Sequence, residues 1–389
     1  MKEEHNILVV SDLHLSEGLD PKTGKTSRLE DFFRDDAFAR FLRHHEEVKH
    51  QPRFGDRPWL LILNGDVFDF LQVVSLPRDG RLLDVIKGSS GGKALTEHER
   101  TYGLGTTAHE SEWKLKQIAR GHQPFFAALG WFVARGNRIA VVRGNHDVEL
   151  HWPEVQERFV TELKRAHVRQ WLREGGHHPT PLHTYHERVR FHPWLYYEPS
   201  RIYVEHGCQY DALNRFEHLL NPVLPDDPQR IKLPWGSLFV RYLFTRIEDV
   251  HPFADNVKPL TRYLSWAFRR EPIKTLGVLA GRGWTFLRGL WFMGRKATSS
   301  ASQGPDDHVS VQAHEDVPLP TEVVERIAAL ARRRVESTWQ AWMGSLTQSF
   351  VSMLSALIIA AFSVLAAVTL LLGTGPAWLA AAYASAALV

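Results

Sequence analysis

The sequence predicts an α/β fold with a mainly parallel sheet, followed by a C-terminal transmembrane helical hairpin. Two observations support this prediction. Short apolar runs alternate with longer stretches of helical periodicity in the N-terminal half of the chain, a pattern typical of parallel strands joined by helical crossovers. In contrast, the last 53 residues of the 389-residue chain contain no Asp, Glu, Lys, Arg or His.

Three apolar runs, at 7–10, 59–63 and 138–142, are predicted to form the central strands. Continuous apolar runs of this length fit strands that are buried on both faces. Helical patterns at 29–48 and 109–135 separate them. Because successive parallel strands need a crossover, this order of elements favours right-handed strand–helix–strand units and a parallel sheet.

The predicted core continues beyond the third strand. Pro153 is suited to the first turn of a further helix. Three β-rich segments follow, at 189–191, 194–197 and 202–205, with turn residues between them. We therefore expect a core domain over residues 1–215.

Composition excludes several classes of protein. The chain has 47 Lys and Arg against 44 Asp and Glu, a net charge of +3, which is too small to imply nucleic-acid binding by itself. The single cysteine, Cys208, rules out an intrachain disulfide and a zinc site made of cysteines. The charged N-terminus, Met1 to His5, leads directly into an apolar run and does not resemble a signal peptide.

The chain changes character after residue 215, where we expect an insertion at 216–297. Within it, the stretch from Lys258 to Lys296 holds nine Lys or Arg against one acid, Glu271, interleaved with aromatic residues. This mixture suits an anionic membrane surface, nucleic acid, or a helical cap with a solvated basic face. A linker rich in Ser, Asp and Pro is expected at 298–321, and a helix at 322–345.

Residues 346–389 are predicted to form the membrane hairpin. The segment 346–372 is uncharged and mostly apolar, and it exceeds the roughly 20 residues that cross a bilayer. Gly373-Thr374-Gly375-Pro376 interrupts it before a second apolar run. Because Arg332, Arg333 and Arg334 precede the first span, the positive-inside tendency predicts a protein of the cytoplasmic membrane with its body on the cytoplasmic side.

Polar clusters follow the predicted strands. Ser11-Asp12-Leu13-His14 comes after the first strand, Asn64-Gly65-Asp66 after the second, Arg143-Gly144-Asn145-His146-Asp147 after the third, and Glu205-His206-Gly207 after the last β-rich segment. One such cluster alone is compatible with a helix cap or a turn. Because ligands bind beyond the carboxyl ends of parallel strands, the ordered series predicts that these side chains converge on one site.

The residue types in these clusters predict a centre with two metal ions. Aspartate, asparagine and histidine supply mixed oxygen and nitrogen ligands, which suit Mn, Fe, Zn, Co or Ni better than Ca or Mg alone. Two ions that share one carboxylate can clamp an in-line displacement at phosphorus and neutralise the charge that develops on the phosphoryl oxygens. The clusters therefore predict a metal-dependent hydrolase of phosphorylated compounds.

Four motifs resemble those of the calcineurin-like metallophosphoesterase family. They are Asp-Leu-His at 12–14, Gly-Asp-Val-Phe-Asp at 65–69, Gly-Asn-His-Asp at 144–147 and His-Gly at 206–207. Over roughly residues 6–211 they have the order and spacing of the family. The resemblance implies a metallophosphoesterase-type α/β sandwich that uses two divalent ions, such as manganese, to hydrolyse a phosphate ester, phosphodiester or pyrophosphate.

The resemblance also implies a set of metal ligands. Asp12 and His14 would bind the first ion, Asp66 would bridge both ions, and Asn145 and His206 would bind the second ion.

Three further residues of the motifs receive supporting roles from the resemblance. His146 would stabilise the transition state or protonate the leaving group, and Asp147 would orient His146. Asp69 is expected to support the ligands from behind.

One motif of the family is missing. Its last motif, Gly-His-x-His, supplies one histidine to each metal ion, and no histidine after His206 has this setting. His251, in Val-His-Pro, is a poor substitute. Since the second apolar run stops after 13 residues, we hypothesise that the sequence is a fragment and that the missing histidines lie beyond Val389.

Several readings of substrate and function are compatible with the sequence. The expected substrate is a phosphorylated small molecule or lipid at the membrane. The motifs also resemble those of UDP-diacylglucosamine hydrolases of lipid precursor synthesis, which typically have Arg in place of His146. A non-catalytic membrane adaptor that retains the fold is a further alternative, favoured by the missing motif. Nucleic-acid hydrolysis through the basic and aromatic stretch is the least favoured, and no feature indicates an oligomeric state.

Overall fold

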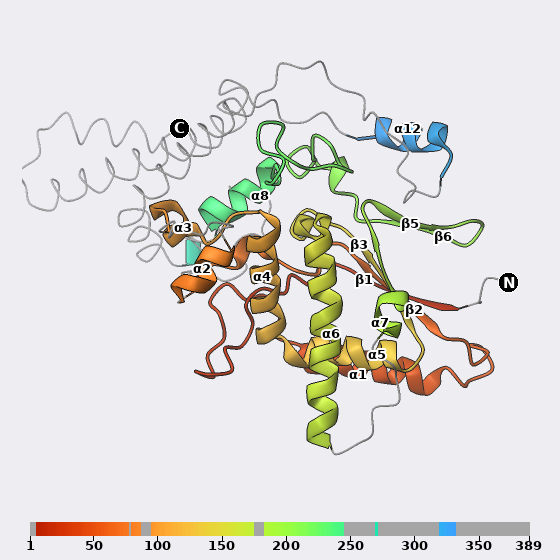
Figure 1. The fold of residues 1–389 in the computed structure, drawn as a ribbon. Helices are drawn as coiled ribbons and strands as arrows, with labels where there is room; N and C mark the ends of the chain where they lie inside the picture. The colour runs from red at the N-terminus through yellow and green to blue at the C-terminus, as the bar shows by residue number, and fades with distance from the viewer. Residues whose placement is uncertain are drawn as a thin grey trace, which may run out of the picture. The chain divides into compact units, whose positions relative to one another are not determined.

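The computed structural model describes residues 5–77, 79–86, 95–174, 183–244, 269–270 and 319–331. These residues form an α/β fold in which a parallel sheet is covered by helices on one face and by a small antiparallel sheet on the other (Figure 1). The predicted α/β class with a parallel sheet is therefore confirmed.

The central sheet has four strands in the order β1-β2-β3-β4. They are β1 (Asn6–Val10), β2 (Trp59–Asn64), β3 (Arg138–Val142) and β4 (Val189–His192), and all three pairings are parallel. The first three coincide with the predicted strands to within one residue. Their register places the carboxyl ends of β1, β2 and β3 at the same edge of the sheet.

The strands β1, β2 and β3 are mostly apolar on both faces because each face meets an apolar layer. Alternate residues of a strand point to opposite sides. One face packs against helical residues of the main core; its members on the strands are Leu8, Leu61, Leu63, Ile139 and Val141. The other face packs against β6; its members on the strands are Leu60, Ile62, Ala140 and Val142.

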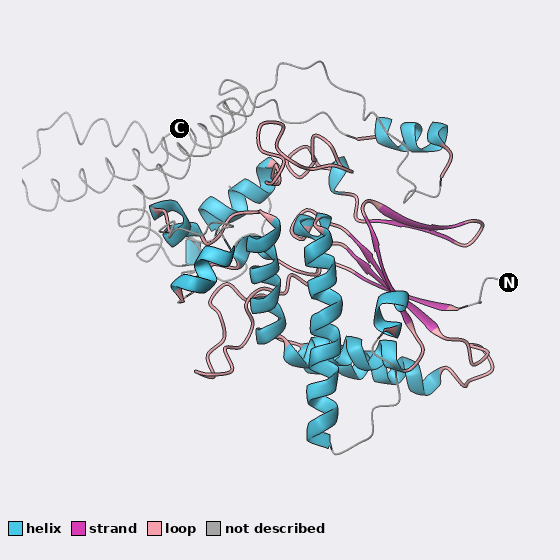
Figure 2. Ribbon diagram, viewed as in Figure 1, coloured by secondary structure: helices cyan, strands magenta, loops and turns pink. Residues whose placement is uncertain are grey.

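The second sheet is the antiparallel pair of β5 (Leu195–Glu198) and β6 (Ile202–Glu205). Val204 of β6 is buried against the central sheet. In Figure 2 the strands of both sheets lie to one side of the layer of helices. The three predicted β-rich segments are therefore strands, but only β4 joins the central sheet.

The helical layer consists mainly of α1 (Asp35–Val48), α4 (Ala108–Gly121), α5 (Gln123–Ala134) and α6 (Pro153–Glu174), with the short α7 (Thr184–Arg188) beside them. Pro153 begins α6, as predicted. The predicted helix at 109–135 is two helices that meet at His122. Pro124 lies in the first turn of α5, where a residue without an N–H is tolerated but where a continuous helix would lose a hydrogen bond.

Several shorter elements complete the fold. They are α2 (Gly80–Ile86), α3 (Glu97–Tyr102), α8 (Trp235–Phe239), a π-helical turn η4 (Val240–Phe244), and the 3₁₀ turns η1 (Phe70–Gln72), η2 (Val148–His151) and η3 (Cys208–Tyr210). The sequence patterns did not predict α2, α3 or α8, because each has at most seven residues and little periodicity.

Only part of the expected C-terminal organisation falls within the described residues. The helix expected at 322–345 corresponds to α12 (Thr321–Ala329) as far as the chain is described there. The membrane hairpin at 346–389 lies outside the described residues, as do the linker up to residue 318 and the stretch from Lys258 to Lys296 except 269–270. Among the residues that are described, no helix is both long and apolar enough to cross a bilayer.

The predicted helix at 29–48 begins six residues late because Glu30 holds the preceding loop. The buried Glu30 carboxylate accepts N–H groups from Ser16 at 3.1 Å and from Gly18 at 2.6 Å. It also faces Nε2 of His122 at 3.0 Å, and Nδ1 of His122 lies 2.8 Å from Asp35. Burial opposes a charge on His122, but the hydrogen bonds to Asp35 and Glu30 outweigh it and raise its pKa to about 9.

The raised pKa of His122 predicts a pH-dependent contribution to stability. An unfolded histidine titrates near pH 6.5, so the charged imidazole stabilises the fold fully below about pH 6.5, and this stabilisation is lost as the pH rises through about 9. We expect His122→Gln to lower Tm by several degrees near pH 6, with the difference shrinking above about pH 9. His50→Gln, at the exposed pair with Asp56, is the matched control and should lack this trend. A loss of Tm that is constant with pH would contradict the assignment.

Candidate metal centre

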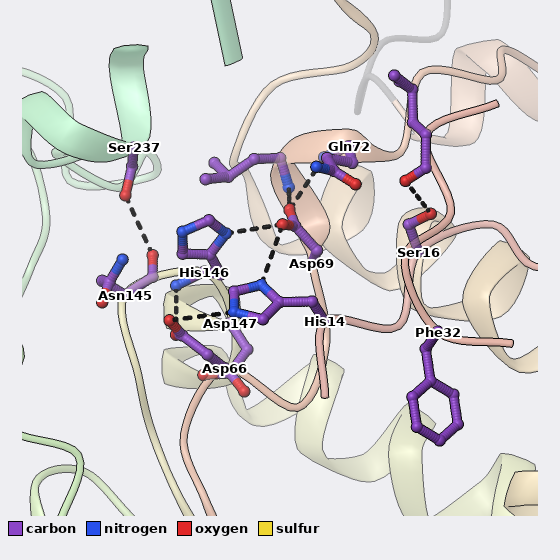
Figure 3. Close-up of polar contacts among 12 residues, drawn as sticks. His14, Ser16, Phe32, Asp66, Asp69, Gln72, Asn145, His146, Asp147 and Ser237 are labelled. Atoms are coloured by element: carbon purple, nitrogen blue, oxygen red, sulfur yellow. Dashed lines mark hydrogen bonds and ion pairs between the residues drawn. The ribbon is translucent and has the colours of Figure 1, made fainter. Parts of the chain in front are cut away.

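The carboxyl ends of β1, β2, β3 and β6 bring all four polar clusters to one site. Figure 3 shows residues of the first three clusters, and His206 of the fourth lies 3.3 Å from Asp66. The site residues expected from the sequence are all among the described ones. Those brought together through direct contacts or shared ligand groups are Asp12, His14, Asp66, Asn145, His146 and His206, with Asp147 behind them.

Two sets of side chains at this site have metal-ligand spacing. One set is His14, Asp66 and His146, and the other is Asp12, Asp66 and His206; in each set the ligand atoms lie within 4.8 Å of one another. Asp66 belongs to both sets. The donor types therefore suit two divalent ions that share one carboxylate.

The grouping of the ligands differs in detail from the expected one. The resemblance pairs Asp12 with His14, whereas the structure groups Asp12 with His206 and places His146 beside His14. Asn145 lies beside His206, with Oδ1 3.2 Å from Nε2 of that imidazole. The assignment of each ligand to one ion stays a prediction.

Three of these residues have strained backbone conformations. Asp12, His14 and Asp66 have φ angles of 53°, 52° and 50°, which are uncommon for residues other than glycine and cost free energy. Hydrogen bonds that extend the β1–β2 pairing hold them: the N–H of Asp12 donates to the carbonyl of Gly65 at 3.1 Å, and that of His14 to the carbonyl of Asp66 at 3.0 Å. The strain therefore lies at the residues that carry the ligand atoms, as is typical of functional sites.

Two glycines allow the loops to approach each other closely. A Cβ on Gly144 would lie 2.2 Å from Oδ1 and 2.5 Å from the backbone nitrogen of Asp66, and one on Gly65 would lie 2.5 Å from the ring of His206. Gly65 also has a φ of +74°, which glycine adopts without strain. The glycines of the two motifs are therefore required by the packing of the site.

The carboxylate of Asp66 lies at the centre of the site and is 4% exposed. Its Oδ1 accepts the backbone N–H of His146 at 2.8 Å, while Oδ2 lies 3.3 Å from Nε2 of His206 and 4.0 Å from Nε2 of His14. Burial favours the neutral acid, but the imidazoles of His146 and His206 hold the pKa of Asp66 well below its usual range. Asp66 is therefore an anion between two imidazoles, which is the arrangement expected of a bridging ligand.

Asp69 holds the two imidazoles on the other side. Its Oδ1 caps η1 by accepting the N–H groups of Leu71 at 2.9 Å and Gln72 at 3.1 Å. Its Oδ2 lies 2.7 Å from Nδ1 of His146 and 3.4 Å from Nδ1 of His14 (Figure 3). Because a carboxylate fixes the tautomer of a histidine that binds a metal through its other nitrogen, Asp69 leaves both Nε2 atoms available as ligands.

The tautomer of His206 is fixed by a backbone carbonyl instead of a carboxylate. Its Nδ1 lies 3.2 Å from the carbonyl of Asn64, and its Nε2 faces oxygens of Asn145 at 3.2 Å and Asp66 at 3.3 Å. With a proton on Nδ1, the lone pair of Nε2 points at two oxygen acceptors, and a cation among these three atoms removes their repulsion. Burial lowers the pKa of His206, but the hydrogen bond with Asp66 raises it to about 9. The oxygens of Asp66 and Asn145 thus favour a positive charge at Nε2 of His206, which either a proton or a divalent ion would supply.

Asp147 differs from its expected role of orienting His146. Its two oxygens accept backbone N–H groups, from Gly144 at 2.6 Å and from Val67 at 2.9 Å. Burial and the nearby carboxylate of Asp66 raise the pKa of Asp147 to about 6. Asp147 therefore joins the loop after β3 to the loop after β2, and the residue that orients His146 is Asp69.

One further contact has no signal in the sequence. Ser237, at the middle of α8, donates from Oγ to the backbone carbonyl of Asn145 at 3.3 Å and is fully buried. Asp69, by contrast, has two signals in the sequence: it ends the Gly-Asp-Val-Phe-Asp motif, and it precedes the turn at Phe70–Gln72, where an aspartate is a frequent cap.

The comparisons with known proteins agree with this geometry. The family model for calcineurin-like phosphoesterases matches residues 5–278. No curated protein and no solved structure matches the chain. The matched region contains all four motifs and every residue of the site, and the chain belongs to the calcineurin-like phosphoesterase family.

Proposed function

We propose that the protein hydrolyses a phosphate ester, phosphodiester or pyrophosphate with two divalent metal ions, manganese being a suitable choice. The observation that supports this most is the Asp66 carboxylate, which is common to both groups of metal ligands. Divalent ions bound there would supply Lewis-acid activation of the phosphoryl group and of the attacking water. The family gives the reaction class, metal-dependent hydrolysis of phosphoesters, and the dinuclear site is our proposal.

The chain's own residues have distinct tasks in this proposal. Asp12, His14, Asp66, Asn145 and His206 hold the ions. The carboxylate of Asp69 orients the ligand His14 through its Nδ1.

His146 completes the site from the loop after β3. Its Nδ1 is bound to Asp69, so in the imidazolium form its second proton is on Nε2, which would protonate the leaving group or donate a hydrogen bond to the phosphoryl oxygens. The backbone N–H of His146 is bound to Asp66, which keeps the imidazole next to the bridging carboxylate.

We further propose that this reaction takes place at the cytoplasmic face of the cytoplasmic membrane, on a phosphorylated small molecule or lipid. The support is in the sequence: 346–372 is long and apolar enough to span a bilayer, and three arginines at 332–334 precede it. Fractionation of cells that express the full chain tests this location. Protein that is released from membranes by high salt alone would contradict it.

A direct assay tests the proposed reaction. The full chain is freed of metal with a chelator and then titrated with Mn²⁺ by calorimetry. Hydrolysis of an aryl phosphate, a bis-aryl phosphodiester and a lipid pyrophosphate is measured before and after loading. We expect two Mn²⁺ per chain and activity on at least one substrate only after loading. A chain that binds no divalent ion and hydrolyses none of the three would refute the proposal.

The shared carboxylate gives the most specific prediction. Asp66→Asn keeps the shape of the side chain but removes the negative charge, so it should lower kcat on the order of 10³-fold or more. Asp56→Asn, at an exposed aspartate paired with His50, is the matched control and should retain wild-type kcat. Full activity in Asp66→Asn would exclude Asp66 as the bridging ligand.

The close approach at Gly144 gives a second prediction. In Gly144→Ala the new methyl group would meet Oδ1 of Asp66 at 2.2 Å, so the carboxylate must move. We expect Mn²⁺ affinity to fall by about tenfold or more, as is common when the support of a metal ligand is disturbed. In Gly24→Ala the methyl group meets no atom within 4 Å, and binding should be unchanged. Equal Mn²⁺ affinity in the two variants would show that this packing is not required.

A further inference from the structure

A buried cluster of charged residues lies behind the candidate metal centre. It consists of Lys114 on α4, Glu149 on η2 and Arg241 on η4, which are 1%, 0% and 4% exposed. Nζ of Lys114 lies 3.7 Å from Oε1 of Glu149. Three elements that are far apart in the sequence therefore meet through buried charges.

The contacts of this cluster are poor as a source of stability. Charges taken out of water cost free energy, and a pair recovers it only with good geometry and additional hydrogen bonds. A separation of 3.7 Å is too long for a hydrogen bond, and within the described part of the chain neither carboxylate oxygen of Glu149 has a hydrogen-bond partner. Apolar pairs of similar volume often stabilise a fold equally or more, so stability alone is a weak reason for these residues.

The cluster adjoins the residue that orients the imidazoles. Both α4 and η4 pack against η1, the turn that Asp69 caps with Oδ1 while its Oδ2 holds His14 and His146. Glu149 lies two residues after Asp147, in the turn that follows the Gly-Asn-His-Asp motif. The pair of Lys114 and Glu149 therefore joins α4, which packs against the turn that Asp69 caps, to the turn that follows His146.

Lys114 lies among three carboxylates, those of Glu149, Glu110 and Asp69, and one further cation, Arg241. Burial and the guanidinium of Arg241 lower the pKa of Lys114 to about 8, against the opposing effect of Glu149, Glu110 and Asp69. Glu110 is also bound to Thr107 in the first turn of α4. Lys114 therefore lies within electrostatic range of both Glu149 and Asp69.

We propose that Lys114 and Glu149 are positioning residues of the metal centre: their buried pair fixes α4, which packs against the turn that Asp69 caps, to the turn that follows His146, and so sets His14 for metal binding and His146 for its role beside the ions. This inference rests on the proposed function. Neither residue touches a ligand atom for the ions, so the expected effect is on metal affinity and on kcat, with KM for the substrate nearly unchanged.

The test replaces the pair without leaving a lone buried charge. The double variant Lys114→Met/Glu149→Gln keeps the approximate volumes and removes both charges, and Lys114→Arg keeps the cation. The matched control is Glu112→Gln/Arg158→Met, which removes a partly buried pair between α4 and α6 with a hydrogen bond of 2.9 Å. For each full-length variant, the Kd for Mn²⁺ is measured by calorimetry, together with kcat, KM and the Tm of the metal-free protein.

We expect the double variant to bind Mn²⁺ about 10- to 100-fold more weakly and to lose kcat, while Lys114→Arg and the control stay within about threefold of wild type. A double variant that folds and binds Mn²⁺ like the wild type would overturn the proposal. One that fails to fold would also overturn it, since the pair would then serve the fold. If the wild type itself neither binds Mn²⁺ nor hydrolyses a phosphoester, the proposed function fails instead, which keeps the two results apart.

Discussion

The buried carboxylate of Asp66 is ionised at a position where burial alone would make it neutral. Its charge depends on imidazoles from two directions and on the backbone N–H of His146. Each of these partners comes from a different strand end, so the parallel order of β1, β2 and β3 and the position of β6 are all needed to place them. The absence of a side chain at Gly144 is needed as well, since a methyl group there would overlap Asp66. The fold can thus be understood as the support that holds one buried anion among the histidines of the candidate metal centre.

The remaining polar groups around the site act on the backbone or on the orientation of the rings. Asp69 and Asp147 are both fully buried aspartates of the motifs, but they have different surroundings. Asp69 has one oxygen on the backbone of η1 and the other on imidazoles, whereas Asp147 uses both oxygens for backbone N–H groups. The first therefore determines which nitrogen of each histidine is free, and the second determines how closely two loops approach. Motif residues of the same chemical type can have separate physical roles.

Much of this arrangement follows from sequence patterns, and the exceptions have physical reasons. Continuous apolar runs predict strands buried on both faces, and polar clusters after them predict a site at one edge of the sheet; both predictions agree with the structure. The sequence patterns assigned the orientation of His146 to Asp147, whereas Asp69 is the residue in contact with its ring. The choice between the two depends on the direction of each carboxylate within its turn. The division of the helix at His122 depends on a local competition around Pro124. The contacts of Ser237 and Lys114 join distant segments, and such long-range packing leaves no periodic signal along the chain.

The hydrogen bonds from Asp12 and His14 to the loop after β2 continue the ladder of the sheet beyond the last paired residues of β1 and β2. The backbone of the candidate metal centre in this sense extends the central sheet. In some small metal-binding domains the site forms only when the ion is bound. Metal binding is then coupled to folding, and removal of the ion by a chelator unfolds the domain. Here the backbone of the site is held by the sheet itself. We therefore expect that an ion binds or leaves by exchanging water for protein ligands. The amide protons of the strands that carry these ligands should remain protected from exchange with solvent.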